Sequence, residues 1–145
     1  MSMTRRKERQ DAVRRIVRRE RIRTQRDLVD RLKGEGLDCT QATVSRDISE
    51  MGMRKLSEGV YVLAEDLHLQ RMISELVVSV VQADNMVIVK ASPGTGPGVA
   101  AALDGAALDE VLGSIAGDDT VLVITRGTDD ATTVVGAIER YRGRP

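Results

Sequence analysis

The spacing of apolar side chains predicts two amphipathic helices at the start of the chain. The first covers roughly residues 5–19, and its apolar stripe consists of Val13, Ile16 and Val17. The second begins after Thr24, which with Asp27 resembles a capping box, and it ends at Gly34 and Gly36. The apolar stripe of this second helix consists of Leu28, Val29 and Leu32.

A third helix is predicted between Thr40, as its N-cap, and Gly52. At about 100° per residue, one narrow arc of this helix is apolar and faces the core. That arc consists of Val44, Ile48 and Met51. The opposite face is small except for one long cation, and it consists of Ala42, Ser45, Arg46 and Ser49. Small side chains let a helix backbone approach a duplex closely, so this pattern is typical of a helix that reads a DNA groove.

The exposed face of the third helix carries groups suited to DNA contacts. Arg46 could pair bidentately with a guanine edge, while Gln41, Thr43 and Ser45 could contact phosphates or bases. The alternative is that Arg46 only pairs with Glu50, one turn later, on a solvated helix.

Two short segments after the third helix, residues 55–57 and 60–64, flank Glu58 and Gly59 and predict a hairpin. Three helices followed by a hairpin form the winged helix-turn-helix arrangement. This wing is short, and we expect it to make at most a minor contact with the DNA backbone.

After a break at residues 65–70, strand and helix patterns alternate. Segments rich in Val and Ile predict two antiparallel hairpins, residues 72–82 with 86–91 and residues 111–116 with 121–125. One helix begins near Pro97, and a second covers roughly residues 131–142. The predicted order is ββαββα, an open antiparallel sheet with helices on one side. The chain is therefore α+β, with domains at residues 1–66 and 67–145.

Several strands are apolar at both alternating positions, although two helices can cover only one face of the sheet. We expect subunit association to cover the other face. The alternative is that the linker and the basic domain fold back over it.

The formal net charge of zero conceals an asymmetry. Residues 1–64 contain 16 Lys and Arg against 10 Asp and Glu, whereas the remainder contains 6 against 12. The basic residues of the first helix region are Arg5, Arg6, Lys7, Arg9, Arg14, Arg15, Arg18, Arg19, Arg21 and Arg23. They are numerous enough to neutralise several phosphates. Single-stranded partners need aromatic stacking platforms, and the chain has no Phe or Trp, so duplex DNA is the favoured partner.

Other chemistry is sparse. The single Cys39 cannot form an internal disulfide, and no signal peptide or membrane span is recognised, so we expect a cytoplasmic protein. Neither Cys39 nor His68 has neighbours that suggest a metal site. An enzyme using Asp104, Asp118 and Asp119 around a metal would need further ligands, so we expect no catalytic residues and no metal.

Those three carboxylates could instead converge on a ligand. Asp104 lies near the end of the first helix of the second half, and Asp118 and Asp119 lie at a hairpin turn. With the glycine-rich turn at residues 92–98, they would offer negative charge to a cation and helix-start amides to an anion. A zwitterion with a cationic tail matches both. The alternative is that Asp118 and Asp119 only form a turn, which Asp favours on its own.

At these residues the chain resembles the bacterial arginine repressors. TQATVSRDI, residues 40–48, resembles the recognition helix of that family. SPG, LD and VLGSIAGDDTVLV, between Ser92 and Val123, resemble its effector domain. The resemblance implies a winged-helix DNA-binding domain and an oligomerisation domain, assembled as trimers that pair into hexamers. It also implies L-arginine as corepressor between the trimers, in a regulator that binds operator DNA and represses arginine biosynthesis.

By the same resemblance, Ser45 and Arg46 match the DNA-reading pair, and Asp104, Asp118 and Asp119 match acidic residues near the ligand. Carboxylates suit this ligand because a planar guanidinium can be received bidentately, a geometry that lysine cannot copy. One departure is Pro97, where family members commonly carry a polar or amide side chain. The alternative functions are therefore a DNA-binding oligomer that responds to another basic amino acid, or to no small molecule.

Overall fold

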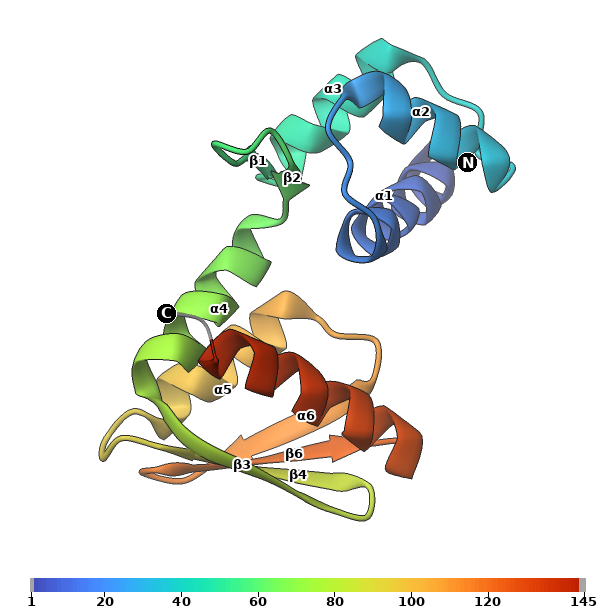
Figure 1. The fold of residues 1–145 in the computed structure, drawn as a ribbon. Helices are drawn as coiled ribbons and strands as arrows, with labels where there is room; N and C mark the ends of the chain where they lie inside the picture. The colour runs from blue at the N-terminus through green and yellow to red at the C-terminus, as the bar shows by residue number, and fades with distance from the viewer. Residues whose placement is uncertain (1, 144–145) are drawn as a thin grey trace. The chain divides into compact units, whose positions relative to one another are not determined.

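A computed structural model describes residues 2–143 and divides the chain into two compact units, with the boundary between Ala64 and Glu65. The first unit contains three helices and a small hairpin (Figure 1). Its elements are α1 (Ser2–Arg19), α2 (Gln25–Gly34), α3 (Gln41–Glu50), β1 (Arg54–Lys55) and β2 (Tyr61–Val62). The predicted winged helix-turn-helix order is confirmed.

The three helices pack around one apolar core. Its fully buried members include Val13, Leu28, Leu32, Val44 and Leu63. Thr24 caps α2 as predicted, because its hydroxyl oxygen accepts a hydrogen bond of 3.0 Å from the amide of Asp27. The hairpin is shorter than predicted: β1 and β2 pair over two residues each, and Leu63 already turns into the core.

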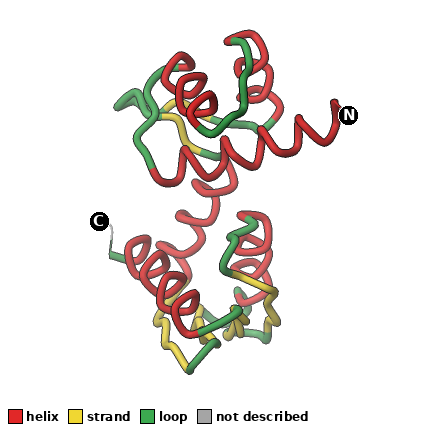
Figure 2. The backbone as a smooth tube through the Cα atoms, turned by 90° about the vertical axis from the view of Figure 1, so that its right-hand side faces the viewer, coloured by secondary structure: helices red, strands yellow, loops and turns green. Residues whose placement is uncertain are grey.

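The second unit is an antiparallel sheet with helices on one face (Figures 1 and 2). Its elements are α4 (Ala64–Leu76), β3 (Val77–Ala83), β4 (Met86–Ala91), α5 (Gly96–Ala106), β5 (Val111–Ala116), β6 (Thr120–Thr125) and α6 (Thr128–Arg142). The strand order is β3-β4-β6-β5. The predicted ββαββα order from β3 to α6 is confirmed, as is the α+β class.

The core of this unit lies between the sheet and its helices. Val87 and Val89 of β4 and Val121 and Val123 of β6 are fully buried there, because alternate side chains of a strand share a face. The helices contribute, among others, Leu69, Ile73, Val99, Leu103, Val134 and Ile138.

The element α4 corrects the predicted linker and first strand. Residues 65–70 are helical, and the strand begins at Val77 and not at Met72. The helix buries Leu69 and Ile73, which lie one turn apart on the same face. Because no glycine or proline separates Leu76 from Val77, the sequence carries no stop signal between helix and strand.

The other face of the sheet carries an apolar row that this unit leaves open. Strand register aligns Val81, Ile88, Leu122 and Ile115 across all four strands, so their side chains project from one face. The two ends of this row, Val81 and Ile115, are 57% and 69% exposed. We call these four residues the open apolar row.

Candidate DNA-reading helix and acidic turn

The helix α3 has the two faces that its sequence predicts. Thr40 caps it, since its hydroxyl oxygen accepts a hydrogen bond of 3.2 Å from the amide of Thr43. Val44 and Ile48 are buried in the core, and Met51 follows as the C-cap. Hydrophobic packing therefore fixes which side of the helix faces outward.

The outward face presents Gln41, Ser45 and Arg46, all of which are exposed. Thr43 is half-buried, and its hydroxyl lies 3.0 Å from that of Thr40. Of the four predicted DNA-contacting residues, three are thus accessible, while the Thr43 hydroxyl already has a neighbour in the cap.

The predicted alternative partner of Arg46 is engaged elsewhere. Glu50 forms an ion pair with Arg6 of α1 and accepts a hydrogen bond of 3.1 Å from the amide of Gln10. Within residues 2–143, Arg46 makes no hydrogen bond or ion pair. The alternative of an Arg46–Glu50 pair is therefore wrong for this structure, and the guanidinium of Arg46 is available to a ligand.

Asp47 is a buried carboxylate that the sequence analysis did not single out. Arg9 donates to both of its oxygens, through Nε and through Nη2 at 3.0 Å, and Gln10 donates to Oδ1 at 3.0 Å. Burial raises the pKa of Asp47, but the hydrogen bonds from Arg9 and Gln10 outweigh burial and leave the pKa below its ordinary value. The signal in the sequence was an acidic residue three positions after Val44, on the core side of the helix.

The basic surface of α1 is smaller than its composition suggests. The ion pairs of its arginines with carboxylates include Arg6 with Glu50, Arg9 with Asp47, Arg14 with Asp11 and Arg15 with Glu35. The prediction that this run neutralises several phosphates rests on its other basic residues. Three of these pairs, those of Arg6, Arg9 and Arg15, link α1 to α3 or to the end of α2.

In the second unit, the predicted acidic turn packs against the start of α5. The amide of Gly94 donates to Oδ2 of Asp118 at 3.1 Å, and the amide of Gly96 donates to the Asp118 carbonyl at 2.9 Å. A Cβ atom at Gly96 would lie 2.2 Å from the carbonyl oxygen of Gly117, so only glycine permits this approach. The glycine-rich loop and the acidic turn are therefore joined by hydrogen bonds and pack directly against each other.

The second carboxylate of the turn belongs to a short polar chain. Asp119 accepts a hydrogen bond of 2.9 Å from the hydroxyl of Thr120, which in turn accepts one of 2.8 Å from Nζ of Lys90. Lys90 and Thr120 are cross-strand partners on β4 and β6, two residues from Ile88 and Leu122 in register. Because alternate residues share a face, this polar chain borders the open apolar row.

Asp104 lies apart from the turn. Its Oδ1 accepts a hydrogen bond of 3.0 Å from the hydroxyl of Ser114 on β5. It follows Gly96 by eight residues along α5, which is about 12 Å of helix at 1.5 Å per residue. Within one chain, the structure brings Asp118 and Asp119 together but leaves Asp104 at the far end of the helix.

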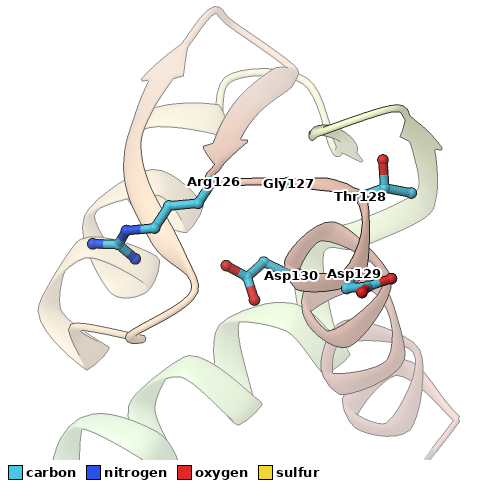
Figure 3. Close-up of a pocket in the computed structure, with 5 residues that line it drawn as sticks. All are labelled: Arg126, Gly127, Thr128, Asp129 and Asp130. Carbon is cyan, nitrogen blue, oxygen red and sulfur yellow. The ribbon is translucent and has the colours of Figure 1, made fainter.

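A separate open cleft of about 310 Å³ lies where β6 leads into α6 (Figure 3). It is lined by Arg126, Gly127, Thr128, Asp129 and Asp130, and in Figure 3 Asp130 points toward the side on which Arg126 lies. Arg126 donates to the carbonyl of Asp109 at 2.7 Å. The cleft includes none of the predicted ligand residues, and we assign it no role.

In the part of the chain that the structure describes, no group of three His, Cys, Asp or Glu side chains is placed to hold a metal ion. Likewise, none of the helices within residues 2–143 has both the length and the apolar composition needed to cross a membrane.

Comparison with known proteins covers both units. Residues 4–69 match the family model described as arginine repressor, DNA binding domain, and residues 73–140 match that described as arginine repressor, C-terminal domain. The arginine repressor of Carboxydothermus hydrogenoformans is 37% identical over 144 residues, covering 92% of this chain and 96% of the relative.

Two other relatives give the same result. The arginine repressor of Caldicellulosiruptor bescii is 42% identical, over 91% of this chain and 93% of its own. That of Thermus thermophilus is 44% identical, over 86% of this chain and 82% of its own. The family models match both units, and relatives 37% to 44% identical match most of the chain, so the chain belongs to the arginine repressor family.

Proposed function

We propose that this protein is an arginine-dependent transcriptional regulator that binds operator DNA and represses arginine biosynthesis genes. Residues 1–66 form its DNA-binding domain, and residues 67–145 form its arginine-binding and oligomerisation domain. The observation that carries this proposal is that Arg46 is exposed and has no partner in the described chain, whereas the carboxylates of Glu50 and Asp47 pair with Arg6 and Arg9 of α1.

Arg46 reads a base and its neighbours place the helix. Its guanidinium donates two parallel hydrogen bonds to the O6 and N7 atoms of a guanine in the major groove. Ser45 and Gln41, near the helix start, contact phosphates or adjacent bases, with Thr43 as a further candidate. The small side chains of Ala42 and Ser49 allow the backbone to approach the duplex.

Copies of the chain associate through the open apolar row. Exposed Val and Ile side chains in one continuous row are costly in water, and a second copy that covers them removes this cost. Trimers that pair into hexamers agree with the family to which the chain belongs. A cytoplasmic location suits a DNA-binding regulator with a single cysteine.

L-arginine binds at the subunit interfaces as corepressor. Asp104 and the turn of Asp118 and Asp119 lie at opposite ends of α5, so a ligand that contacts both ends needs carboxylates from two chains. A guanidinium shared between facing carboxylates neutralises their repulsion and favours the assembled state. Arginine binding is thereby coupled to assembly and to the spacing of the DNA-binding units.

A second candidate effector is another basic amino acid, such as ornithine. Pro97 stands in the first turn of α5 and offers neither a side-chain amide nor a backbone N–H to a ligand. The acidic turn keeps its carboxylates, so a cationic tail still has a binding partner.

The variant Arg46→Ala tests the proposal. Two duplexes are compared, the one that the wild-type protein enriches most from a random-sequence pool and a scrambled duplex of the same composition. We expect the variant to lose about 1 to 3 kcal/mol of binding free energy on the enriched duplex and little on the scrambled one, in fluorescence anisotropy titrations.

The solution mass of the Arg46→Ala variant should equal that of the wild type, because Arg46 lies outside the oligomerisation unit. Exposed Arg26 of α2 provides a matched control, since Arg26→Ala removes the same charge from another helix of the same unit. Equal discrimination between the two duplexes by wild type and Arg46→Ala would sink the assignment of α3 as the reading helix.

A further inference from the structure

The helices α1 and α3 share the apolar core of the first unit, and long polar side chains also join them directly. Their backbones approach each other at few points, whereas α2 packs against both. The direct link is a set of hydrogen bonds and ion pairs, which we call the α1–α3 clamp. Its members are Arg6, Arg9 and Gln10 of α1 and Asp47 and Glu50 of α3.

The clamp has a defined geometry at its centre. Nε and Nη2 of Arg9 donate to the two different oxygens of Asp47, which makes the contact bidentate. Such a fork fixes the angle between the two groups as well as their separation, whereas a single hydrogen bond leaves rotation free. Gln10 adds hydrogen bonds of 3.0 Å to Asp47 and 3.1 Å to Glu50, which lie on adjacent turns of α3.

The position of Asp47 couples this fork to DNA reading. Arg46 precedes Asp47 directly and projects about 100° away around the helix axis. Any rotation of α3 about its axis that moves Asp47 therefore moves Arg46 through the same angle. A long side chain converts a small rotation into a large displacement of its guanidinium, and a bidentate base contact tolerates little displacement.

We propose that Arg9 and Asp47 are positioning residues for sequence recognition, which set the rotation of α3 without touching DNA. This inference rests on the proposed function of α3. Arg9 is an unsuitable phosphate contact because its side chain is only 18% exposed and its charge is met by a carboxylate that is 2% exposed.

Two variants of the full-length protein test this role. Arg9→Lys keeps the charge but replaces the planar fork with a single ammonium, and Arg9→Gln removes the charge as well. The quantity measured is the ratio of affinities for the enriched and the scrambled duplex, together with its dependence on salt concentration. We expect both variants to lower this ratio by at least about fivefold, the low end of what one lost base contact costs.

The salt dependence separates positioning from direct contact. If Arg9 only positions α3, binding of Arg9→Gln to the scrambled duplex keeps the wild-type slope against salt concentration. Arg15→Lys is the matched control, because Arg15 lies on the same helix but pairs with Glu35 at the end of α2. This control should keep the wild-type ratio, and thermal unfolding of each variant verifies that the chain is folded at the assay temperature.

Three outcomes count against the proposal in different ways. An unchanged affinity ratio in folded Arg9→Lys and Arg9→Gln overturns it. A shallower salt slope for Arg9→Gln, with equal losses on both duplexes, overturns it in favour of a phosphate contact. If the wild-type protein enriches no duplex at all, the proposed function fails first, and this inference fails with it.

Discussion

Burial and hydrogen bonding shift the pKa of Asp47 in opposite directions. Burial favours the protonated acid, whereas Arg9 and Gln10 favour the carboxylate and prevail. The pKa is therefore lower in the folded chain than its ordinary value of 3.8. A lowered pKa means that the carboxylate stabilises the folded state above that value, and that this contribution is lost as the pH falls through the folded pKa.

The variant Asp47→Asn should lose about 2 to 4 kcal/mol of unfolding free energy at pH 7, because it leaves a half-buried guanidinium without its counter-charge. The difference from wild type should begin to shrink as the pH falls below about 4, where the carboxyl of the unfolded chain is protonated, and should continue to shrink as the pH falls through the lower pKa of the folded state. Urea unfolding at several pH values measures both effects. The exposed Asp38 provides the control, and Asp38→Asn should change stability by less than about 0.5 kcal/mol. A pH-independent difference for Asp47→Asn would contradict this account.

At single residues, the sequence is informative where the cause is local. The Thr40 cap and the outward direction of Arg46 follow from helix geometry and from the buried stripe of α3, and both were predicted. The partners of Asp47 and Glu50 lie 37 to 44 positions away in the chain. No periodicity within α3 identifies them, because they depend on how α1 packs in three dimensions.

Among the elements, α4 has a helical pattern in its sequence that the prediction of a strand from Met72 did not take into account. Leu69, Met72, Ile73 and Leu76 recur at helical spacing, which is the pattern of an amphipathic helix. The β-branched run that starts at Val77 extended the predicted strand backward into this helix. Where residues before a β-branched run recur at helical spacing, as they do before Val77, the strand begins at the run and not before it.

The sheet shows how much can be predicted from the alternation of side chains along a strand. Apolar residues at both alternating positions predicted a sheet with two apolar faces, and strand register assembles one of these into the open apolar row. What covers this row in solution depends on the partner chain and not on the order of residues, so the oligomer remains a proposal. Register is nevertheless what makes the proposal specific, since it identifies which side chains to change.

We expect Ile115→Asp to dissociate the oligomer without unfolding the chain. Ile115 lies at one end of the open apolar row and is mostly exposed within one chain, so a carboxylate there is solvated in the monomer and desolvated in an assembly. Light scattering after size-exclusion chromatography measures the mass, and circular dichroism measures the fold. Thr133→Asp adds the same charge at an exposed position of α6 and should keep the wild-type mass. A wild-type mass for folded Ile115→Asp would exclude this face as the interface.

For the whole molecule, the uneven distribution of charge predicts that DNA binding and subunit association depend differently on salt concentration. The basic excess lies in residues 1–64 and the acidic excess in the remainder, so DNA binding should weaken steeply with salt. Association through an apolar face depends little on ionic strength, since burial of apolar surface is not screened. In the proposed scheme, the effector site lies between the second units of two chains, because it needs carboxylates from both chains.

Coupling between arginine and DNA must be reciprocal if L-arginine is the corepressor. A factor by which arginine tightens operator binding equals the factor by which the operator tightens arginine binding. Calorimetric titration with L-arginine, with and without the enriched duplex, measures the second factor, while lysine, ornithine and citrulline test selectivity.

We expect Asp119→Asn to weaken arginine binding by about tenfold or more, as loss of a charge-assisted hydrogen bond does, while keeping arginine-free DNA binding. Exposed Asp109→Asn is the control. An unchanged arginine response in Asp119→Asn would show that the acidic turn does not bind the effector.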